Sequence, residues 1–121
     1  MTIVGIDHIQ LAIPPGGEVA AREFYIAVMG FTEVEKPAAM YARGGGLWLA
    51  AGPVSLHLGI EDGMRPSAKM HPALRVTELD RWASRLLAAG RQWREATDLP
   101  GVRRGHTSDP FGNRIELVEV G

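Results

Sequence analysis

The stretch DPFGNRIELVE, residues 109–119, places one carboxylate between two aliphatic side chains in a predicted strand. A strand alternates its faces, so Ile115 and Leu117 point to one side while Glu116 points to the other. The aliphatic face is expected to pack against a core. Glu116 then faces either bulk water or an enclosed pocket, and the rest of the chain bears on which of the two it is.

The composition indicates one compact domain whose function depends on a few residues at a site rather than on the overall charge. The chain has 121 residues, 45% of them hydrophobic, enough to bury about two-thirds of the surface of the unfolded form. The 13 basic and 14 acidic residues nearly balance, and no basic stripe is present, so neither nucleic acid nor an anionic membrane is an expected partner. A small-molecule substrate is expected instead.

The absence of cysteine excludes a disulfide framework, a thiolate metal site and a cysteine nucleophile. The N-terminus, MTIVGIDHIQ, lacks the charged and then apolar pattern of a signal peptide, and no apolar run is long enough to span a bilayer. The expected location is the cytoplasm.

The first half of the chain shows strand and helix periodicities in succession. Alternating aliphatic residues predict a half-buried strand over residues 3–13. Ala20, Phe24 and Val28 then recur at steps of four, which predicts an amphipathic helix ending at Gly30. Two further strands are predicted over residues 47–50 and 54–60.

The second half repeats this order. A strand over residues 70–76 has Pro72 near its start, where a missing N–H group is tolerated. A helix follows, with Thr77 and Asp80 as its expected cap and Gly90 as its end, and strands are predicted near residues 92–95, 103–108 and 114–119. The predicted fold is therefore α+β, one domain of two tandem βαβββ modules over residues 1–62 and 63–121.

Residues that can bind a metal recur at equivalent points of the two modules. His8 and His71 belong to the strands that open them, and His57 and Glu116 to the strands that close them. If helices cover one face of each sheet, these side chains share the opposite faces. Imidazole and carboxylate ligands suit one divalent ion of Zn, Ni, Mn, Fe or Co with open positions for substrate oxygens.

Three residues near these candidates are predicted to contact the substrate. Gln10 and Arg75 share the faces of the ligand candidates and can hydrogen-bond or charge-pair with a substrate oxygen. Trp48 is the aromatic residue expected to touch a ligand, whereas the other aromatics are interpreted as core and pocket wall. His106, beside Arg103 and Arg104, is interpreted as part of the rim.

At this point the chain resembles a known group, the vicinal oxygen chelate superfamily of glyoxalase I, extradiol dioxygenases, fosfomycin-resistance thiol transferases and bleomycin-resistance proteins. The resemblance covers essentially the whole chain, and the motifs that carry it are DHIQLAI, FYIAVMGF, LHLGIE, HPALRV and DPFGNRIEL. It implies paired βαβββ modules in an incomplete, cleft-bearing β-barrel, a homodimer, and a metal in the cavity.

By this resemblance His8, His57, His71 and Glu116 fall at the four ligand positions of glyoxalase I, and Glu116 doubles as the catalytic base. Glyoxalase I generally has a second glutamate where this chain has His57, so the site would keep a positive charge.

Three functions stay open from the sequence. The leading hypothesis is a metal-dependent lyase, isomerase or dioxygenase of this type acting on an oxygen-chelating substrate. The second is a metal-free dimer that sequesters a ligand, as bleomycin-resistance proteins do. The third is a structural or regulatory dimer that has lost the site. Each histidine also has a simpler interpretation as a surface or hydrogen-bonded residue, and Arg75 as the partner of a surface acid.

Overall fold

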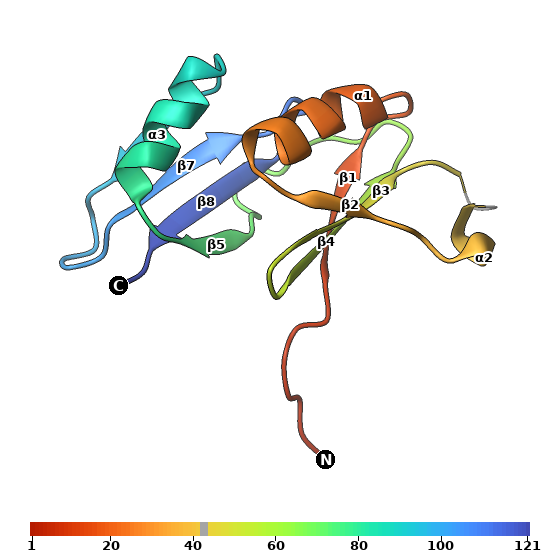
Figure 1. Cartoon of the computed structure of the whole chain (residues 1–121), viewed down its shortest axis with the longest axis horizontal. Coiled ribbons are helices and arrows are strands. Elements are labelled where there is room, and N and C mark those ends of the chain that lie inside the picture. Colours follow the sequence, from red (N-terminus) through yellow and green to blue (C-terminus); the bar gives the residue numbers. More distant parts are fainter. Residues whose placement is uncertain (42–43) are drawn as a thin grey trace. The chain divides into compact units, whose positions relative to one another are not determined.

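A computed structural model describes residues 1–41 and 44–121 of the chain, with the side chain of Tyr41 left aside. The chain divides into two compact units, Met1–Met64 and Arg65–Gly121. Each unit contains a four-stranded mixed sheet with helical segments (Figure 1). The predicted α+β fold of two tandem βαβββ modules is confirmed.

The first unit has the sheet order β1-β4-β3-β2, with β1 parallel to β4 and the other neighbours antiparallel. The strand β2 and the short helix α2 had no counterpart among the residue ranges predicted from the sequence. The elements of the unit are β1 (Ile9–Ile13), α1 (Glu18–Ala21), η1 (Arg22–Val28), β2 (Thr32–Val34), α2 (Ala38–Tyr41), β3 (Leu47–Ala51) and β4 (Val54–Ile60).

The second unit repeats this topology with the order β5-β8-β7-β6, and β5 is parallel to β8. Its long helix packs on one face of the sheet (Figure 1). The elements are β5 (Ala73–Val76), α3 (Leu79–Ala88), β6 (Arg94–Ala96), β7 (Arg104–Ser108) and β8 (Arg114–Glu119).

The core of each unit lies between helix and sheet, where the alternation of the strands puts the aliphatic side chains. In the second unit, Leu79 and Leu86 of α3 and Ile115 and Leu117 of β8 are all at most 1% exposed. Burying such side chains contributes about 1.5–3 kcal/mol each. In the first unit the buried hydrophobic residues are Ile13, Ala21, Phe24, Tyr25, Met29, Phe31, Leu47, Leu49, Leu56 and Leu58.

The opening strand of the first unit is shorter than predicted. It begins at Ile9 rather than Ile3, because β4 pairs with it only from Leu56 to Ile60. Before Ile9 the described chain forms no ladder, and Ile3 and Ile6 are 94% and 82% exposed. The alternation of aliphatic residues extends N-terminally beyond the point where pairing with β4 stops. The sequence pattern alone does not show where that point lies.

The first helix has a different apolar stripe from the predicted one. It continues from α1 as the π-helix η1, in which backbone hydrogen bonds span one residue more than in an α-helix. Phe24 of the predicted stripe is buried, but Ala20 and Val28 are only half-buried, and Ala21, Tyr25 and Met29 join Phe24 in the core instead. Gly30, with φ 82°, follows the helix as predicted.

The cap of α3 comes from a distant strand rather than from Thr77. The helix starts after Glu78, whose side chain caps no backbone group. Glu119 on β8 accepts a hydrogen bond from the backbone N–H of Leu79 at 2.8 Å. A carboxylate at a helix N-terminus also favours the helix dipole, so this contact ties α3 to the closing strand. No helix in the described ranges is long and apolar enough to cross a membrane.

Replacing Glu119 with alanine is expected to lower the free energy of unfolding by about 1 kcal/mol, the usual cost of losing an N-terminal cap. Urea-induced unfolding followed by circular dichroism measures this loss. Glu119→Gln keeps an acceptor oxygen and is the matched control, with a smaller loss expected. Equal losses in both variants would show that the negative charge, rather than the hydrogen bond, stabilises the helix.

Candidate metal centre

The strand registers put the predicted metal-binding residues at equivalent places in the two units. His57 lies opposite Gln10 in the first unit, and Glu116 lies opposite Ala73 in the second. His8 and His71 each come two residues before those partners. Both therefore lie just before the opening strand rather than within it.

The third strand of each unit adds another side chain to the same row. Trp48 lies opposite His57, and His106 lies opposite Glu116. One face of each sheet thus presents four matching positions. They are His8, Gln10, Trp48 and His57 in the first unit, and His71, Ala73, His106 and Glu116 in the second.

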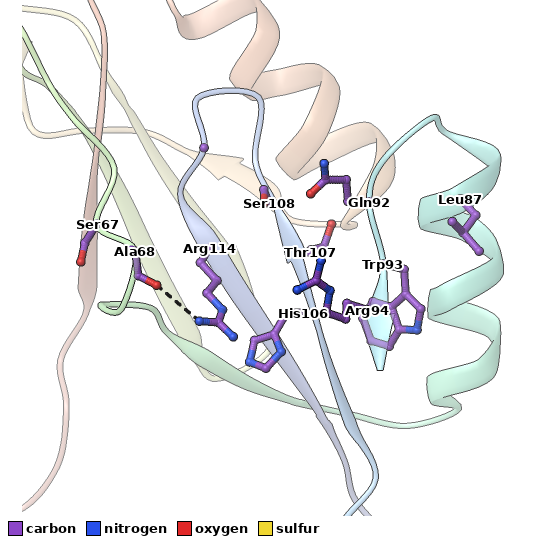
Figure 2. Close-up of a pocket in the computed structure, with 11 residues that line it drawn as sticks. Ser67, Ala68, Leu87, Gln92, Trp93, Arg94, His106, Thr107, Ser108 and Arg114 are labelled. Atoms are coloured by element: carbon purple, nitrogen blue, oxygen red, sulfur yellow. Dashed lines mark hydrogen bonds between the residues drawn. The ribbon is translucent and has the colours of Figure 1, made fainter. Parts of the chain in front are cut away.

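A cavity of about 610 Å³ opens where β6 begins and β7 ends, and His106 forms part of its wall (Figure 2). All of its lining residues belong to the second unit. His106 therefore joins this space to the polar cluster around Glu116, rather than lying on a rim as the sequence analysis proposed.

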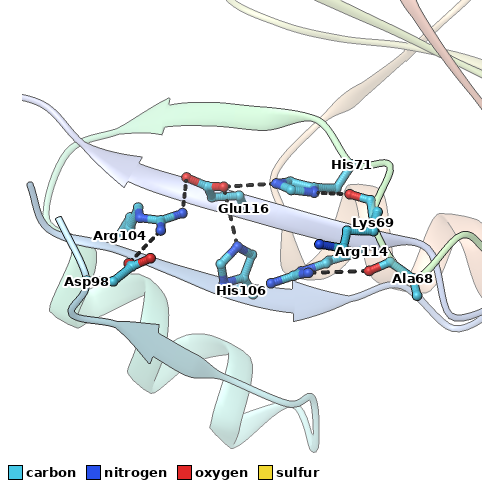
Figure 3. A network of polar contacts seen from close by, with 8 residues as sticks. All are labelled: Ala68, Lys69, His71, Asp98, Arg104, His106, Arg114 and Glu116. Carbon is cyan, nitrogen blue, oxygen red and sulfur yellow. Dashed lines mark hydrogen bonds and ion pairs between the residues drawn. The ribbon is translucent and has the colours of Figure 1, made fainter.

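Glu116 is the centre of that cluster (Figure 3). Its Oε1 lies 2.9 Å from His71 Nε2 and 3.3 Å from His106 Nε2. One ligand atom from each of the three residues lies within 4.8 Å of the others. Glu116 is only 7% exposed, so the carboxylate in the motif of residues 109–119 faces an enclosed polar cluster and not bulk water.

The second nitrogen of His71 is held by the backbone. His71 Nδ1 lies 2.6 Å from the carbonyl oxygen of Lys69, and a carbonyl can only accept, so Nδ1 carries a proton. A neutral ring then has its lone pair on Nε2, the atom that faces Glu116. This is how metal-binding histidines are commonly oriented.

The other oxygen of Glu116 is held by Arg104. Arg104 Nη1 lies 3.2 Å from Glu116 Oε2, and its Nη2 donates to Asp98 Oδ1 at 2.6 Å. The two carboxylate oxygens therefore have separate roles: Oε2 is oriented by the guanidinium and Oε1 faces the two histidines. The hydrogen bond to Asp98, with that to Glu116 next, also raises the pKa of Arg104.

The electrostatics of the cluster favour an ionised Glu116 and a neutral His106 at neutral pH. Burial acts to raise the pKa of Glu116, but hydrogen bonds from His71 and Arg104 and the charges of Arg104 and His106 outweigh it, and the pKa is lowered. Burial, with the charge of Arg114, lowers the pKa of His106 against the opposing effect of Glu116. An ionised carboxylate and a neutral imidazole are the forms that bind metals.

The turn between β7 and β8 fixes this arrangement. The Oδ1 atom of Asp109 accepts hydrogen bonds from the backbone N–H groups of Phe111 and Asn113 at 2.9 and 2.8 Å, and its Oδ2 accepts one from the Asn113 side chain at 2.8 Å. Gly112 has φ 92°, a conformation that favours glycine. The closed turn sets the register that puts His106 opposite Glu116.

The equivalent row of the first unit is a stack of rings. The imidazole of His57 stacks at 4.1 Å on His8 and at 4.1 Å on Trp48, with interplanar angles of 19° and 4°. Burial, followed by the charge of His8, lowers the pKa of His57. The indole of Trp48 is thus a neighbour of a predicted metal ligand.

The sequence-predicted site residues fall into two groups. His8, His57, Gln10 and Trp48 meet within the first unit, and His71 and Glu116 within the second. The four-ligand set extends over both units and stays a prediction. Gln10 lies beside Gly59, where a Cβ would come within 2.6 Å of its Nε2, and Arg75 is exposed on β5.

His106 and Arg104 were not predicted as members of the site. The signal for His106 was its alternation with Gly105 and Thr107, which puts it on the Glu116 face once the hairpin register is known. Arg104 shares that face two residues earlier. Neither assignment is possible without the pairing of β7 with β8.

Comparisons with known proteins agree with this fold. The model of the Glyoxalase/Bleomycin resistance protein/Dioxygenase superfamily matches residues 5–117. The chain belongs to this superfamily. Among curated proteins, none matches the sequence.

Solved structures of superfamily members are similar over nearly the whole chain. A glyoxalase family protein from Bacillus anthracis is 39% identical, with a TM-score of 0.94 over 100% of this chain and 98% of the other. The antibiotic binding protein TnmS3 from Streptomyces sp. CB03234 is 25% identical, with a TM-score of 0.76 over 100% and 99%. The fosfomycin resistance protein FosX from Listeria monocytogenes shares the fold at 17% identity, with a TM-score of 0.80 over 99% and 96%.

The lowered pKa of Glu116 predicts a loss of stability in acid. Because its folded-state pKa lies below the unfolded value of about 4.3, its ionised form stabilises the fold above that pH, and this contribution disappears as the pH falls through the folded-state value. The difference in free energy of unfolding between the wild type and Glu116→Gln should therefore shrink from about pH 5 to pH 3. Urea titrations across this range measure it. A difference that stays constant would contradict the assignment, and Glu23→Gln controls for removal of one carboxyl group.

Proposed function

We propose that the protein is a metal-dependent enzyme of the glyoxalase and dioxygenase type, acting on a small substrate that chelates through oxygen atoms. The observation that carries the proposal is the 2.9 Å approach of His71 Nε2 to Glu116 Oε1. With Nδ1 of His71 already protonated, Nε2 makes this contact either by carrying a second proton, which it donates to Glu116, or by sharing a cation with the carboxylate.

A proton or a divalent ion can supply that positive charge, and the donor set fits an ion. His71, His106 and Glu116 offer two nitrogen atoms and one oxygen atom close together, a set typical of open catalytic sites of Zn, Ni, Mn, Fe or Co. A bound ion would polarise a substrate oxygen as a Lewis acid.

The remaining roles belong to residues of the chain. Arg104 and the Lys69 carbonyl hold Glu116 and His71 in orientation. Glu116, ionised at neutral pH by its lowered pKa, is the proposed proton acceptor for the substrate. His106 brings the cluster to the wall of the cavity. The cluster thus lies where a small molecule can reach it.

Metal content tests this proposal directly. Protein purified without a histidine tag, chelated, and reloaded with Zn, Ni, Mn or Fe(II) should retain about one ion per chain in elemental analysis. Glu116→Ala should lose the ion, because both a ligand and the negative charge of the site disappear. Arg104→Gln should bind about 10–100-fold more weakly, the usual cost of losing a group that orients a ligand.

Two outcomes separate the alternatives. Retention of stoichiometric metal by a folded Glu116→Ala protein would exclude Glu116 as a ligand. His8→Ala and His57→Ala, measured in the same way, test the four-ligand set predicted from the sequence. Glu78→Gln, which removes an exposed carboxyl group from the same unit, is the matched control and should keep its metal.

A second candidate function is metal-free ligand binding. It is favoured by the ion pair with Arg104, which already neutralises the charge of Glu116 without a metal, and by the similarity to the antibiotic binding protein TnmS3. Failure of all four metals to bind, together with tight binding of a small molecule, would select this function over the enzyme.

We also propose that the protein is a cytoplasmic homodimer. The exposed aliphatic side chains of Ile3, Val4 and Ile6 support an association that covers them, since runs of exposed apolar residues usually mark interfaces. Light scattering coupled to gel filtration should give twice the chain mass of 13.1 kDa. Ile3→Ser with Ile6→Ser should lower the fraction of dimer, and a monomeric wild type would contradict the proposal.

A further inference from the structure

The cavity of the second unit has a one-sided charge. Two arginines, Arg94 and Arg114, line it, and no aspartate or glutamate is among its described lining residues. Its volume of about 610 Å³ is in the range of small-molecule sites. A cavity lined by two permanent cations without a carboxylate favours an anionic occupant.

The two arginines are weakly engaged within the protein. Among the described residues, the guanidinium of Arg114 donates a single long hydrogen bond, 3.4 Å to the carbonyl oxygen of Ala68 (Figure 2). The guanidinium of Arg94 makes no hydrogen bond or ion pair with another residue in the described part of the chain. This differs from Arg103 and Arg104, which are held by carboxylates. Free N–H groups in a guanidinium fork match the geometry of a carboxylate or phosphate group.

The strand register places these arginines beside the metal cluster. Arg94 lies directly opposite His106, and His106 lies opposite Glu116. Arg114 shares the face of Glu116 and lies opposite Ser108, next to His106 along the ladder. A molecule with an oxyanion at the arginines therefore lies next to the proposed metal ligands.

The rest of the wall is apolar at one side. Trp93 packs against Gly105, where a Cβ would meet its indole ring, and Leu87 of α3, which lines the same cavity, is 58% exposed. An aromatic ring and an aliphatic side chain provide a surface for a planar or apolar body.

From these features we infer that the cavity binds a small organic anion whose carboxylate or phosphate group contacts Arg94 and Arg114 and whose apolar body lies against Trp93. This inference rests on the proposed function and deepens it, since it names the substrate class of the same site.

Binding of benzoate, phenyl phosphate and neutral benzyl alcohol to chelator-treated protein, measured by calorimetry, tests the inference. One or both anions should bind at least about tenfold more tightly than benzyl alcohol, and their relative affinities distinguish a carboxylate from a phosphate substrate. Rising ionic strength should weaken their binding. Equal binding of the neutral alcohol, or no binding of either anion, would overturn the inference.

Single substitutions test whether the anion binds at the cavity arginines. Arg94→Gln and Arg114→Gln should each weaken binding about tenfold. Arg81→Gln changes the net charge equally but lies outside this cavity, so it should retain affinity within about twofold. An equal loss in Arg81→Gln, or no loss in the two cavity arginine variants with their thermal unfolding unchanged, would overturn the inference.

The metal content of the same preparations separates this inference from the proposed function. Metal retention without anion binding overturns the inference alone. Anion binding, lost in Arg94→Gln, by a protein with no affinity for metal supports the anion site and contradicts the metal enzyme.

Discussion

The structure of the second unit depends on the side chain of Asp109. By accepting backbone hydrogen bonds from Phe111 and Asn113 it closes the turn between β7 and β8, and a closed turn fixes the register of a hairpin. A slip of one residue would turn every side chain of β8 to the opposite face. Ile115 and Leu117 would then leave the core, and Glu116 would enter it without partners.

The same register explains why a charged residue can be buried in this sheet. Glu116 is paired with His71, just before β5, and with Arg104 and His106 on β7. Removing an ionised carboxylate from water is costly unless it is paired and hydrogen-bonded. The cost is offset here by partners whose positions the ladder fixes, so the polar cluster and the apolar core follow from one alignment of strands.

The two units share one topology but have different side chains at the matching positions. In the first unit the row of matching positions contains stacked rings, Trp48 on His57 on His8. In the second unit the same positions contain a carboxylate between two imidazoles. One scaffold thus presents a row of stacked rings and a candidate metal-binding cluster, as expected for a superfamily whose chemistry lies in side chains placed on a common fold.

The sequence by itself determined the order of the elements other than β2 and α2, because period-two and period-four patterns and glycines such as Gly30 and Gly90 are local signals. It also determined that His71 corresponds to His8, and Glu116 to His57, in a repeat of two modules. Only the tertiary structure decided that β1 begins at Ile9, that Glu119 caps α3, and that His106 and Arg104 contact Glu116. These depend on which strand lies opposite which, and pairing between residues distant in the chain leaves no local pattern in the sequence.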